Sequence, residues 1–340
     1  MTKFSRLRNL TLLLSVALIA VFVAVAALGG RAEAAVSAGE TAYVDVTAAT
    51  LWTSPGSARA VDRPALANPA DLSRWLNGMS KAQKDDLIYS SRTQTQALYG
   101  QRVRVLATKN GWAKIAVPTQ ATPKNSRDYP GWVPQRQLVS GSKAAFKGRP
   151  VAQVSDPRAG LFEDRALTQR MIPLSFGTRL AVVERAPGKI KVATPSGPDG
   201  WISAGAANVY ASPASIPGPT PAKLENTARK FLGLEYLWAG TSGFAFDCSG
   251  FTHQIYRSHG INLPRDAGDQ RSKGQSVARA NLKKGDLVFF ANQNGVYHMG
   301  MYLQDGKMIH ASNRRSADVR IEKITESSYN ADYAGARRYL

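Results

Sequence analysis

Hydrophobic and polar positions alternate along two segments of the chain that follow the same plan. Each segment has an alternating run, a glycine turn, a second alternating run, a loop, and a Gly-Trp pair that opens a third run. The three runs lie at residues 101–106, 111–115 and 131–133 in the first copy and at residues 178–183, 188–192 and 200–202 in the second. Because such alternation indicates half-buried strands, the repeat predicts two small β-barrels. Residues 61–90 of the first copy predict an insertion that is partly helical around residues 71–87.

The pattern changes at residues 212–221, which contain four prolines and predict a linker. Thr220 and Pro221 then suit the cap and the first turn of a helix. The apolar positions of that helix recur at helical spacing: Leu224, Ala228, Phe231 and Leu232. A second helix is expected to begin near Cys248 and to end near Gly260. Strand-like runs follow at residues 286–290, 296–303 and 307–311. Helices followed by antiparallel strands predict an α+β domain.

The N-terminus has the pattern of an export signal. Lys3, Arg6 and Arg8 precede an apolar stretch at residues 10–28, and Ala32-Glu33-Ala34 supplies a small-x-small cleavage site. The apolar stretch is long for a removed signal and close to the length of a spanning helix, so a retained N-terminal anchor is the alternative. Both interpretations place the remaining chain outside the cytoplasm, as a secreted, cell-wall-associated or membrane-anchored protein.

The composition is that of a folded, strongly basic protein. Hydrophobic residues make up 44% of the chain, which excludes a disordered polymer. The net charge is +20, and it is +17 without residues 1–34, which hold four basic residues and one acidic residue. Such a surface attracts polyanions, although solubility alone also accounts for it. For an exported chain we expect anionic wall polymers rather than nucleic acid.

The chain has a single cysteine, Cys248, so it can form no internal disulfide. Asp247 suits the N-cap of the helix that follows, which places Cys248 in the first turn. Unpaired backbone N–H groups there favour a thiolate and can hold a developing oxyanion. The sequence therefore suggests a nucleophile with a lowered pKa, and a buried structural cysteine is the alternative.

Two of the four histidines lie on neighbouring strand-like runs. Antiparallel pairing of these runs would bring His298 and His310 together. A cysteine at a helix start that faces a histidine on a strand suits thiolate catalysis, and a third polar group can orient the base. Zinc bound by Cys248, His298 and His310 is the alternative. No short pair of ligands accompanies these residues, so we expect no metal and no other cofactor.

Residues 223–340 resemble the NlpC/P60 family of papain-like peptidases. The matching motifs occur in the family's order: 234–240 (LEYLWAG), 246–251 (FDCSGF), 263–266 (LPRD), 285–290 (GDLVFF), 298–302 (HMGMY) and 310–311 (HA). The resemblance implies that Cys248, His298 and His310 form a catalytic triad and that Tyr236 bounds the oxyanion site. Ala239 is a departure, because the family often has glycine there.

The upstream half resembles a subgroup, the γ-D-glutamyl-L-diamino acid endopeptidases, through residues 95–100, 121–125 and 128–134. These enzymes carry two bacterial SH3 domains before the catalytic domain, and the first helps to form the substrate pocket. The resemblance implies substrate contacts at four residues: Tyr129, Asp247, Ser249 and Asp266. Asp247 and Ser249 are expected to bind the substrate's free amine. Gln101 departs from the acidic residue often found after Tyr-Gly.

We therefore expect an α+β cysteine peptidase with two SH3-like barrels. The expected parts are a signal peptide or anchor at 1–34, barrels at 36–140 and 141–211, a linker at 212–221 and the catalytic domain at 222–340. Its expected substrate is the γ-D-glutamyl–diamino acid bond of peptidoglycan stem peptides or muropeptides with a free N-terminal L-Ala. A hydrolase of intact wall and a wall-binding protein with weak activity are the alternatives. The sequence leaves the oligomeric state and the identity of the diamino acid open.

Overall fold

A computed structural model describes residues 36–141, 146, 148–314 and 316–340. The expected signal peptide or anchor at residues 1–34 lies outside the described residues. In the part of the chain that the structure describes, no helix is both long and apolar enough to span a membrane.

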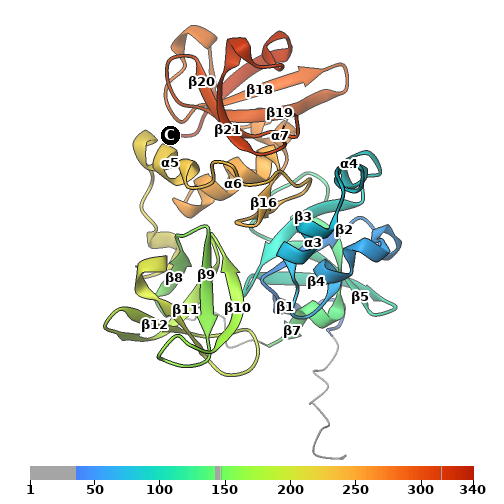
Figure 1. The fold of residues 1–340 in the computed structure, drawn as a ribbon, viewed down its shortest axis with the longest axis vertical. Helices are drawn as coiled ribbons and strands as arrows, with labels where there is room; N and C mark the ends of the chain where they lie inside the picture. Colours follow the sequence, from blue (N-terminus) through green and yellow to red (C-terminus); the bar gives the residue numbers. More distant parts are fainter. Residues whose placement is uncertain (1–35, 142–145, 147, 315) are drawn as a thin grey trace, which may run out of the picture. The chain divides into compact units, whose positions relative to one another are not determined.

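The first repeat forms a seven-stranded sheet in the order β3-β2-β6-β5-β4-β1-β7 (Figure 1). Its strands are β1 (Thr41–Val44), β2 (Ala48–Trp52), β3 (Thr93–Leu98), β4 (Arg102–Lys109), β5 (Trp112–Val117), β6 (Tyr129–Pro134) and β7 (Leu138–Ser140). All its pairs are antiparallel, and the inward residues form one apolar core.

The second repeat has the same topology, β10-β9-β13-β12-β11-β8-β14, with each strand number raised by seven. Its strands are β8 (Val151–Val154), β9 (Arg158–Phe162), β10 (Arg170–Ser175), β11 (Arg179–Ala186), β12 (Lys189–Val192), β13 (Gly200–Ser203) and β14 (Ala207–Tyr210). A Cβ at Gly131 would lie 2.6 Å from Leu51 Cβ, and one at Gly200 would lie 2.6 Å from Leu161 Cδ1. Both Gly-Trp pairs thus mark a close approach to the neighbouring strand, which confirms the predicted repeat.

The insertion in the first repeat is helical, as predicted. It contains α2 (Arg63–Leu66), α3 (Leu72–Gly78) and α4 (Lys81–Tyr89). Trp75 lies fully buried against Trp52 of the first barrel, with ring centroids 6.1 Å apart. The Trp75 indole N–H donates to buried Asp62, so its polar atom is also satisfied.

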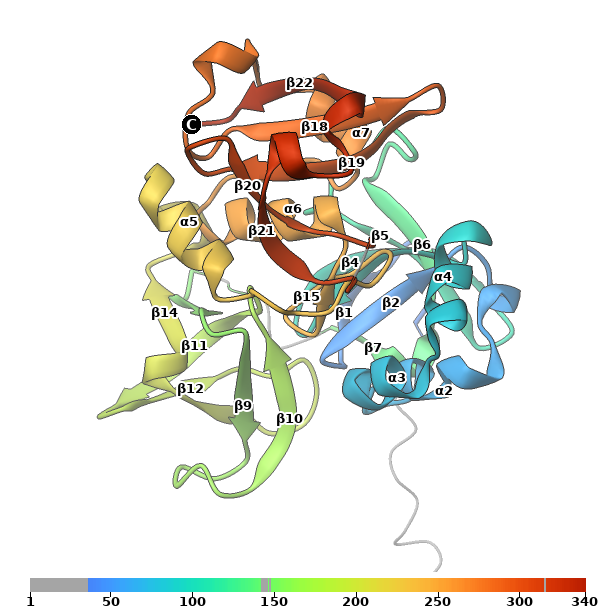
Figure 2. The same cartoon turned by 45° about the horizontal axis from the view of Figure 1, so that its top comes forward.

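The C-terminal domain packs three helices against a six-stranded antiparallel sheet of order β17-β22-β18-β19-β20-β21 (Figure 2). The helices are α5 (Pro221–Arg229), α6 (Cys248–Ser258) and α7 (Ala267–Ser272). The strands are β17 (Gln275–Val277), β18 (Leu287–Asn292), β19 (Gly295–Tyr302), β20 (Lys307–Ala311), β21 (Val319–Lys323) and β22 (Tyr333–Arg338), with a short hairpin β15 (Thr241–Ser242) and β16 (Ala245–Phe246). The first helix ends earlier than predicted: the chain turns after Arg229 and leaves Leu232 exposed.

Short 3₁₀ segments connect these elements: η1 (Pro55–Ser57), η2 (Ala60–Asp62), η3 (Gln135–Gln137), η4 (Ala204–Ala206), η5 (Pro213–Ser215), η6 (Arg279–Asn281), η7 (Ile324–Glu326) and η8 (Asn330–Asp332).

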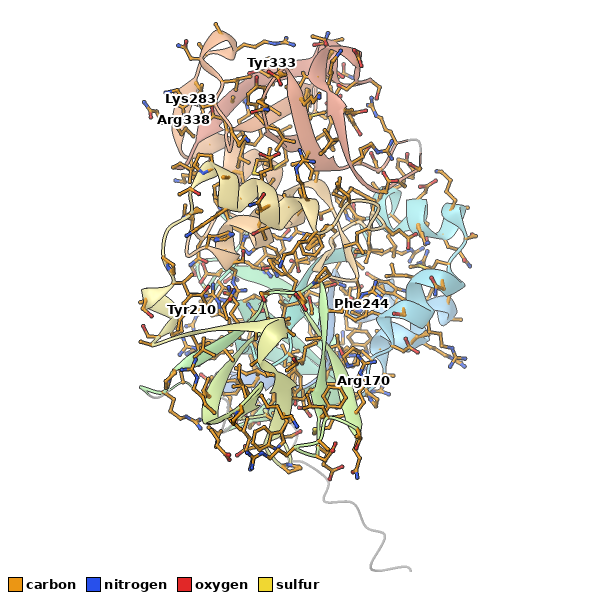
Figure 3. All side chains as sticks on the ribbon, turned by 60° about the vertical axis from the view of Figure 1, so that its left-hand side comes forward. Arg170, Tyr210, Phe244, Lys283, Tyr333 and Arg338 are labelled. Atoms are coloured by element: carbon orange, nitrogen blue, oxygen red, sulfur yellow. The ribbon has the colours of Figure 1, made fainter. Side chains whose placement is uncertain are left out.

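The β15–β16 hairpin contacts both repeats. The Thr241 N–H donates to Gln96 Oε1 of the first repeat at 3.1 Å, and the Gly243 N–H donates to Ser175 Oγ of the second at 2.9 Å. Phe244, labelled in Figure 3, shares an apolar cluster with the first repeat and its insertion, and the Arg158 guanidinium lies 4.5 Å from its ring centroid. These contacts hold the loop before α6 against both barrels.

Candidate active site

Helix α6 begins at Cys248 because Asp247 caps it, as predicted. Asp247 has an extended backbone, and its Oδ1 accepts the Gly250 N–H at 2.6 Å. The loop before the helix lies so close that a Cβ at Gly250 would stand 2.0 Å from the Gly240 carbonyl oxygen. Because Gly250 has no side chain, the first turn of α6 can pack directly against this loop.

The Cys248 sulfur lies in a buried site between α6 and β19, with the residue only 6% exposed. The backbone N–H groups of Ser249 and Met299 act on the sulfur and lower the pKa of the thiol. Burial, followed by the Asp247 carboxylate, raises the pKa of the thiol to about 12 against the lowering effect of Arg265 and the two N–H groups. The predicted lowering of the cysteine pKa is therefore wrong for the free protein, since desolvation outweighs the helix start.

His298 lies on β19 beside Met299, so the strand that contacts the sulfur also carries the imidazole. Its Nε2 lies 2.6 Å from Nδ1 of His310 on β20, which leaves Nδ1 of His298 available to a thiol proton. A Cβ at Gly300 would lie 3.0 Å from His310 Cβ, so this glycine gives the second imidazole room. Burial, then His310 and Arg314, lowers the pKa of His298 well below its usual value. The base is therefore neutral at pH 7.

Two residues that sequence reasoning missed support this pair. Glu322 Oε1 lies 3.0 Å from His310 Nε2, so the contacts run from His298 through His310 to a carboxylate. The ring of Tyr329 stacks on His298 with centroids 4.0 Å apart and planes 13° apart, and its hydroxyl lies 3.0 Å from Ser312 Oγ. Glu322 lies in the alternating run of β21, but its position relative to His310 depends on the pairing of β20 with β21.

Asp247 already has a cationic partner. Its two oxygens accept from Arg265 at 2.6 and 3.1 Å, and both side chains are almost fully buried. Arg265 also donates to Ser249 Oγ at 3.0 Å and to Thr95 Oγ1 of the first repeat at 2.8 Å. The charge of Asp247 is therefore neutralised within the protein, and its contact with the substrate's amine stays a prediction.

Asp266 is the carboxylate that opens to the cavity. Its side chain is 33% exposed, and its oxygens accept from the Tyr129 hydroxyl at 2.9 and 3.0 Å. Lys124 Nζ lies 2.8 Å from Asp266 Oδ2 and 2.5 Å from the Tyr129 hydroxyl. Burial and then Asp266 raise the pKa of Tyr129, which keeps this phenol protonated.

These residues border one cavity of about 700 Å³. The C-terminal domain contributes Tyr236, Trp238, Asp247, Cys248, Ser249, Arg265, Asp266 and His298, and the first repeat contributes Thr93, Gln94, Lys124 and Tyr129. His310 lies behind His298, away from the lining. Gln101 is not part of this cavity; its side chain binds the Leu98 N–H and Thr119 instead. Among the described residues, no group of three or more His, Cys, Asp or Glu side chains could hold a metal ion.

A cysteine at a helix start beside a histidine on an antiparallel sheet defines a papain-like cysteine peptidase site. Residues 233–338 match the NlpC/P60 family, and residues 154–210 match the YKFC SH3b2 domain. The chain is 44% identical to a γ-D-glutamyl-L-lysine dipeptidyl-peptidase of Bacillus cereus, over 88% of this chain and 91% of that protein. It is 35% identical to a protein of the same name from Bacillus subtilis, over 85% and 96%.

A crystal structure of an NlpC/P60 family protein from Bacillus cereus superposes with a TM-score of 0.85 at 42% identity. The match covers 88% of this chain and all of that one. The chain belongs to the NlpC/P60 family of peptidases.

Proposed function

We propose that this protein hydrolyses the γ-D-glutamyl–diamino acid bond of peptidoglycan stem peptides that begin with a free L-Ala. The observation that carries the proposal is the cavity, where the Cys248–His298 pair lies with the carboxylate of Asp266 and a wall formed by the first repeat. The names of the two Bacillus relatives support the same bond for this chain. Their identity extends over both repeats as well as the catalytic domain, so the likeness includes the cavity wall.

The proposed reaction begins with a neutral thiol and a neutral imidazole. His298 Nδ1 takes the Cys248 proton while the sulfur attacks the γ-carbonyl carbon of D-Glu. The oxyanion that forms is held by backbone N–H groups at the start of α6, with Tyr236 bounding its site. The His298 imidazolium then protonates the leaving amine of the diamino acid, and the C–N bond breaks to give a thioester.

Water completes the cycle. His298 takes a proton from the water as its oxygen attacks the thioester, and the thiolate leaves and regains that proton. His310 holds the ring of His298 through the 2.6 Å contact. Glu322, 3.0 Å from His310, stabilises positive charge that spreads into the pair. No metal ion or cofactor takes part in this mechanism.

Asp266 and Tyr129 are the residues proposed to bind the substrate's ammonium. The sequence also assigns Asp247 and Ser249 to this role; in the free protein Asp247 caps α6, and both residues accept hydrogen bonds from Arg265. An ammonium on a partly enclosed carboxylate forms a charge-assisted hydrogen bond, and acetylation or attachment to glycan removes this charge. The proposal therefore favours released muropeptides over intact wall.

Mass spectrometry of products from L-Ala-γ-D-Glu-L-Lys and its N-acetylated form tests this function. We expect release of L-Ala-D-Glu and lysine, with the acetylated peptide cleaved at least about tenfold more slowly, because acetylation removes a charge-assisted hydrogen bond worth about 1.5–3 kcal/mol and adds bulk. Cys248→Ala should be inactive with an unchanged circular dichroism spectrum. Equal rates on the two peptides would favour a hydrolase of intact wall, and binding without cleavage would favour a wall-binding protein.

We further propose that the protein acts outside the cytoplasm, secreted, wall-associated or anchored. The basic and apolar pattern of residues 3–34 supports this location, and the net charge of +20 suits anionic wall polymers. Fractionation of cells that express the full chain, with N-terminal sequencing of the product, distinguishes a removed signal from a retained anchor.

A further inference from the structure

The cation nearest to the proposed amine site belongs to the protein itself. Lys124 Nζ lies 2.8 Å from Asp266 Oδ2 and 2.5 Å from the Tyr129 hydroxyl, with Gln94 Oε1 at 3.5 Å. It also lies 4.5 Å from the centroid of the Tyr129 ring. A carboxylate, a hydroxyl, an amide oxygen and an aromatic face are together the partners that an ammonium group takes. In the free protein this subsite is therefore filled by a side-chain ammonium.

We propose that Lys124 occupies the place of the substrate's α-ammonium in the free enzyme and must leave when the substrate binds. Lys124 is then a specificity-determining residue, because it competes only with substrates that bring an ammonium to Asp266. This inference rests on the proposed function, since it concerns the same subsite.

The charges that line the cavity make the competition necessary. The described lining contains three carboxylates, each with a cation at ion-pair distance: Asp85 with Lys81, Asp247 with Arg265, and Asp266 with Lys124. Arg314 adds a further positive charge to the lining. An incoming ammonium therefore finds no carboxylate without a cation, and at Asp266 it competes with Lys124.

Lys124 is the cation that can move at small cost. Arg265 is held by two oxygens of Asp247, Ser249 and Thr95, and its side chain is only 1% exposed. Lys124 lies in the loop between β5 and β6, and its side chain is 44% exposed, so its Nζ can turn into water on a flexible stem. The Lys81–Asp85 pair lies on the insertion and does not contact Asp266.

Removing the competing ammonium should tighten binding of the substrate. A partly exposed ion pair contributes little to stability, so the expected effect is modest, about a fivefold fall in KM. Lys124→Met keeps the length of the stem and removes the charge. Lys124→Arg keeps the charge and adds donors, so its KM should equal or exceed that of the wild type.

The test compares wild type, Lys124→Met and Lys124→Arg on the free and N-acetylated tripeptides. Lys81→Met is the matched control, since it removes one positive charge from the same cavity at a carboxylate other than Asp266. We expect Lys124→Met to lower KM about fivefold for the free peptide alone, with kcat unchanged, while Lys81→Met has a smaller effect. A KM that rises on both peptides would overturn the proposal and show that Lys124 binds a substrate carboxylate. An unchanged KM, or an equal fall in Lys81→Met, would also overturn it.

Calorimetry separates this inference from the proposed function. In the Cys248→Ala background, L-Ala-D-Glu should bind about fivefold more tightly when Lys124 is also Met. Suppose that wild type cleaves neither peptide while Lys124→Met still binds L-Ala-D-Glu more tightly. That result would support the competition by Lys124 and contradict the proposed cleavage of the γ-D-glutamyl–diamino acid bond. If wild type cleaves the free peptide while Lys124→Met changes neither KM nor this affinity, the bond assignment stands and the competition is overturned.

Discussion

At the scale of single residues, burial sets the protonation states on which the proposed reaction depends. The Cys248 thiol has its pKa raised and the His298 imidazole has its pKa lowered, both chiefly by burial. The resting pair is therefore uncharged, and charge develops only when the proton moves. Residues that stabilise a positive charge on His298 then act on the transition state rather than on the resting enzyme.

Substitution of the base His298, of His310 and of Glu322 should produce a graded loss of activity. His298→Ala should reduce kcat about as much as Cys248→Ala, because these two act as a unit. His310→Ala should retain roughly ten to a hundred times more activity than His298→Ala, since an orienting member costs less when removed. Glu322→Gln should cost less still. Steady-state kinetics on the free tripeptide measures the order, and equal losses at His298 and His310 would mean that the two share the role of base.

Asp247 and Asp266 should respond differently to the same change. Asp247→Asn removes the negative charge and one of the two oxygens that pair with the buried Arg265. The protein should therefore be destabilised by about 3–5 kcal/mol. Asp266→Asn alters a carboxylate that is 33% exposed and should change stability by less than about 1 kcal/mol while raising KM for the free tripeptide. Urea unfolding and kinetics of both variants test this difference. A stable Asp247→Asn variant with a selectively raised KM would support the amine-binding role that the sequence predicts for Asp247.

At the scale of elements, the position of the nucleophile depends on how closely α6 approaches the loop before it. Asp247 N donates to the Gly240 carbonyl at 3.1 Å, and Asp247 in turn caps the helix. In the same loop, Ala239 has a φ of +67°, in the left-handed region that glycine adopts most easily. The departure from the family's glycine is therefore a small local strain beside the active site.

Gly250→Ala should disturb this contact. The added methyl would stand 2.0 Å from the Gly240 carbonyl oxygen, so the helix or the loop must shift. We expect a loss of about 1–3 kcal/mol in stability and a fall in kcat, because the sulfur moves with the first turn. Gly78→Ala is the control, since its Cβ meets nothing within 4 Å. If Gly250→Ala has the kinetics of the wild type, the loop that contains Gly240 can move without displacing the sulfur.

Local sequence patterns predicted most helices and strands. Side-chain contacts between residues far apart in the sequence could not be predicted from these patterns. Helical capping marked the start of α6, and the two Gly-Trp pairs marked equivalent strands. The contacts of Arg265 with Thr95 and of Tyr129 with Asp266 join residues more than 130 positions apart. The direction of the Cys248 pKa shift was missed for the same reason, because burial is a property of the assembled domains.

At the scale of the whole described chain, both repeats contribute to the environment of the catalytic helix. The first repeat supplies Tyr129 and Lys124 to the cavity. The second supplies Phe176 to the apolar core around α6, and its Arg179 donates to the Arg257 carbonyl at the helix's C-terminal end at 2.6 Å. Both repeats therefore help to form the surroundings of the catalytic helix.

Gly243→Ala tests whether the contact between the second repeat and the β15–β16 hairpin affects substrate binding. A Cβ there would lie 1.9 Å from the Pro157 carbonyl oxygen, so the β15–β16 hairpin must separate from β9 and its loop. Stability should fall by about 1–3 kcal/mol, and KM for the tripeptide should rise although Gly243 does not line the cavity. Gly218→Ala in the linker, where a Cβ meets nothing within 4 Å, is the control. An unchanged KM would show that the second repeat supports only stability.

Acid should destabilise the fold through its histidines before most carboxylates titrate. All four histidines have a lowered pKa, chiefly because of burial: His253, His259, His298 and His310. For His253 the pKa falls to about 3 from an ordinary value of 6.5, while its Nδ1 donates to the Leu263 carbonyl at 2.8 Å. Between these values the unfolded chain binds a proton that the folded chain does not, so stability decreases as the pH falls through this window.

From pH 7 to pH 5 this linkage should cost about 2 kcal/mol for His253 alone. His253→Gln keeps a donor for the Leu263 carbonyl and removes the titration, so its loss between these pH values should be smaller than that of the wild type by about this amount. Urea unfolding at several pH values measures the difference, with His259→Gln as the comparison because His259 is less buried. Identical pH dependence in wild type and His253→Gln would mean that His253 takes up its proton in the folded state, through an opening of the α6 region.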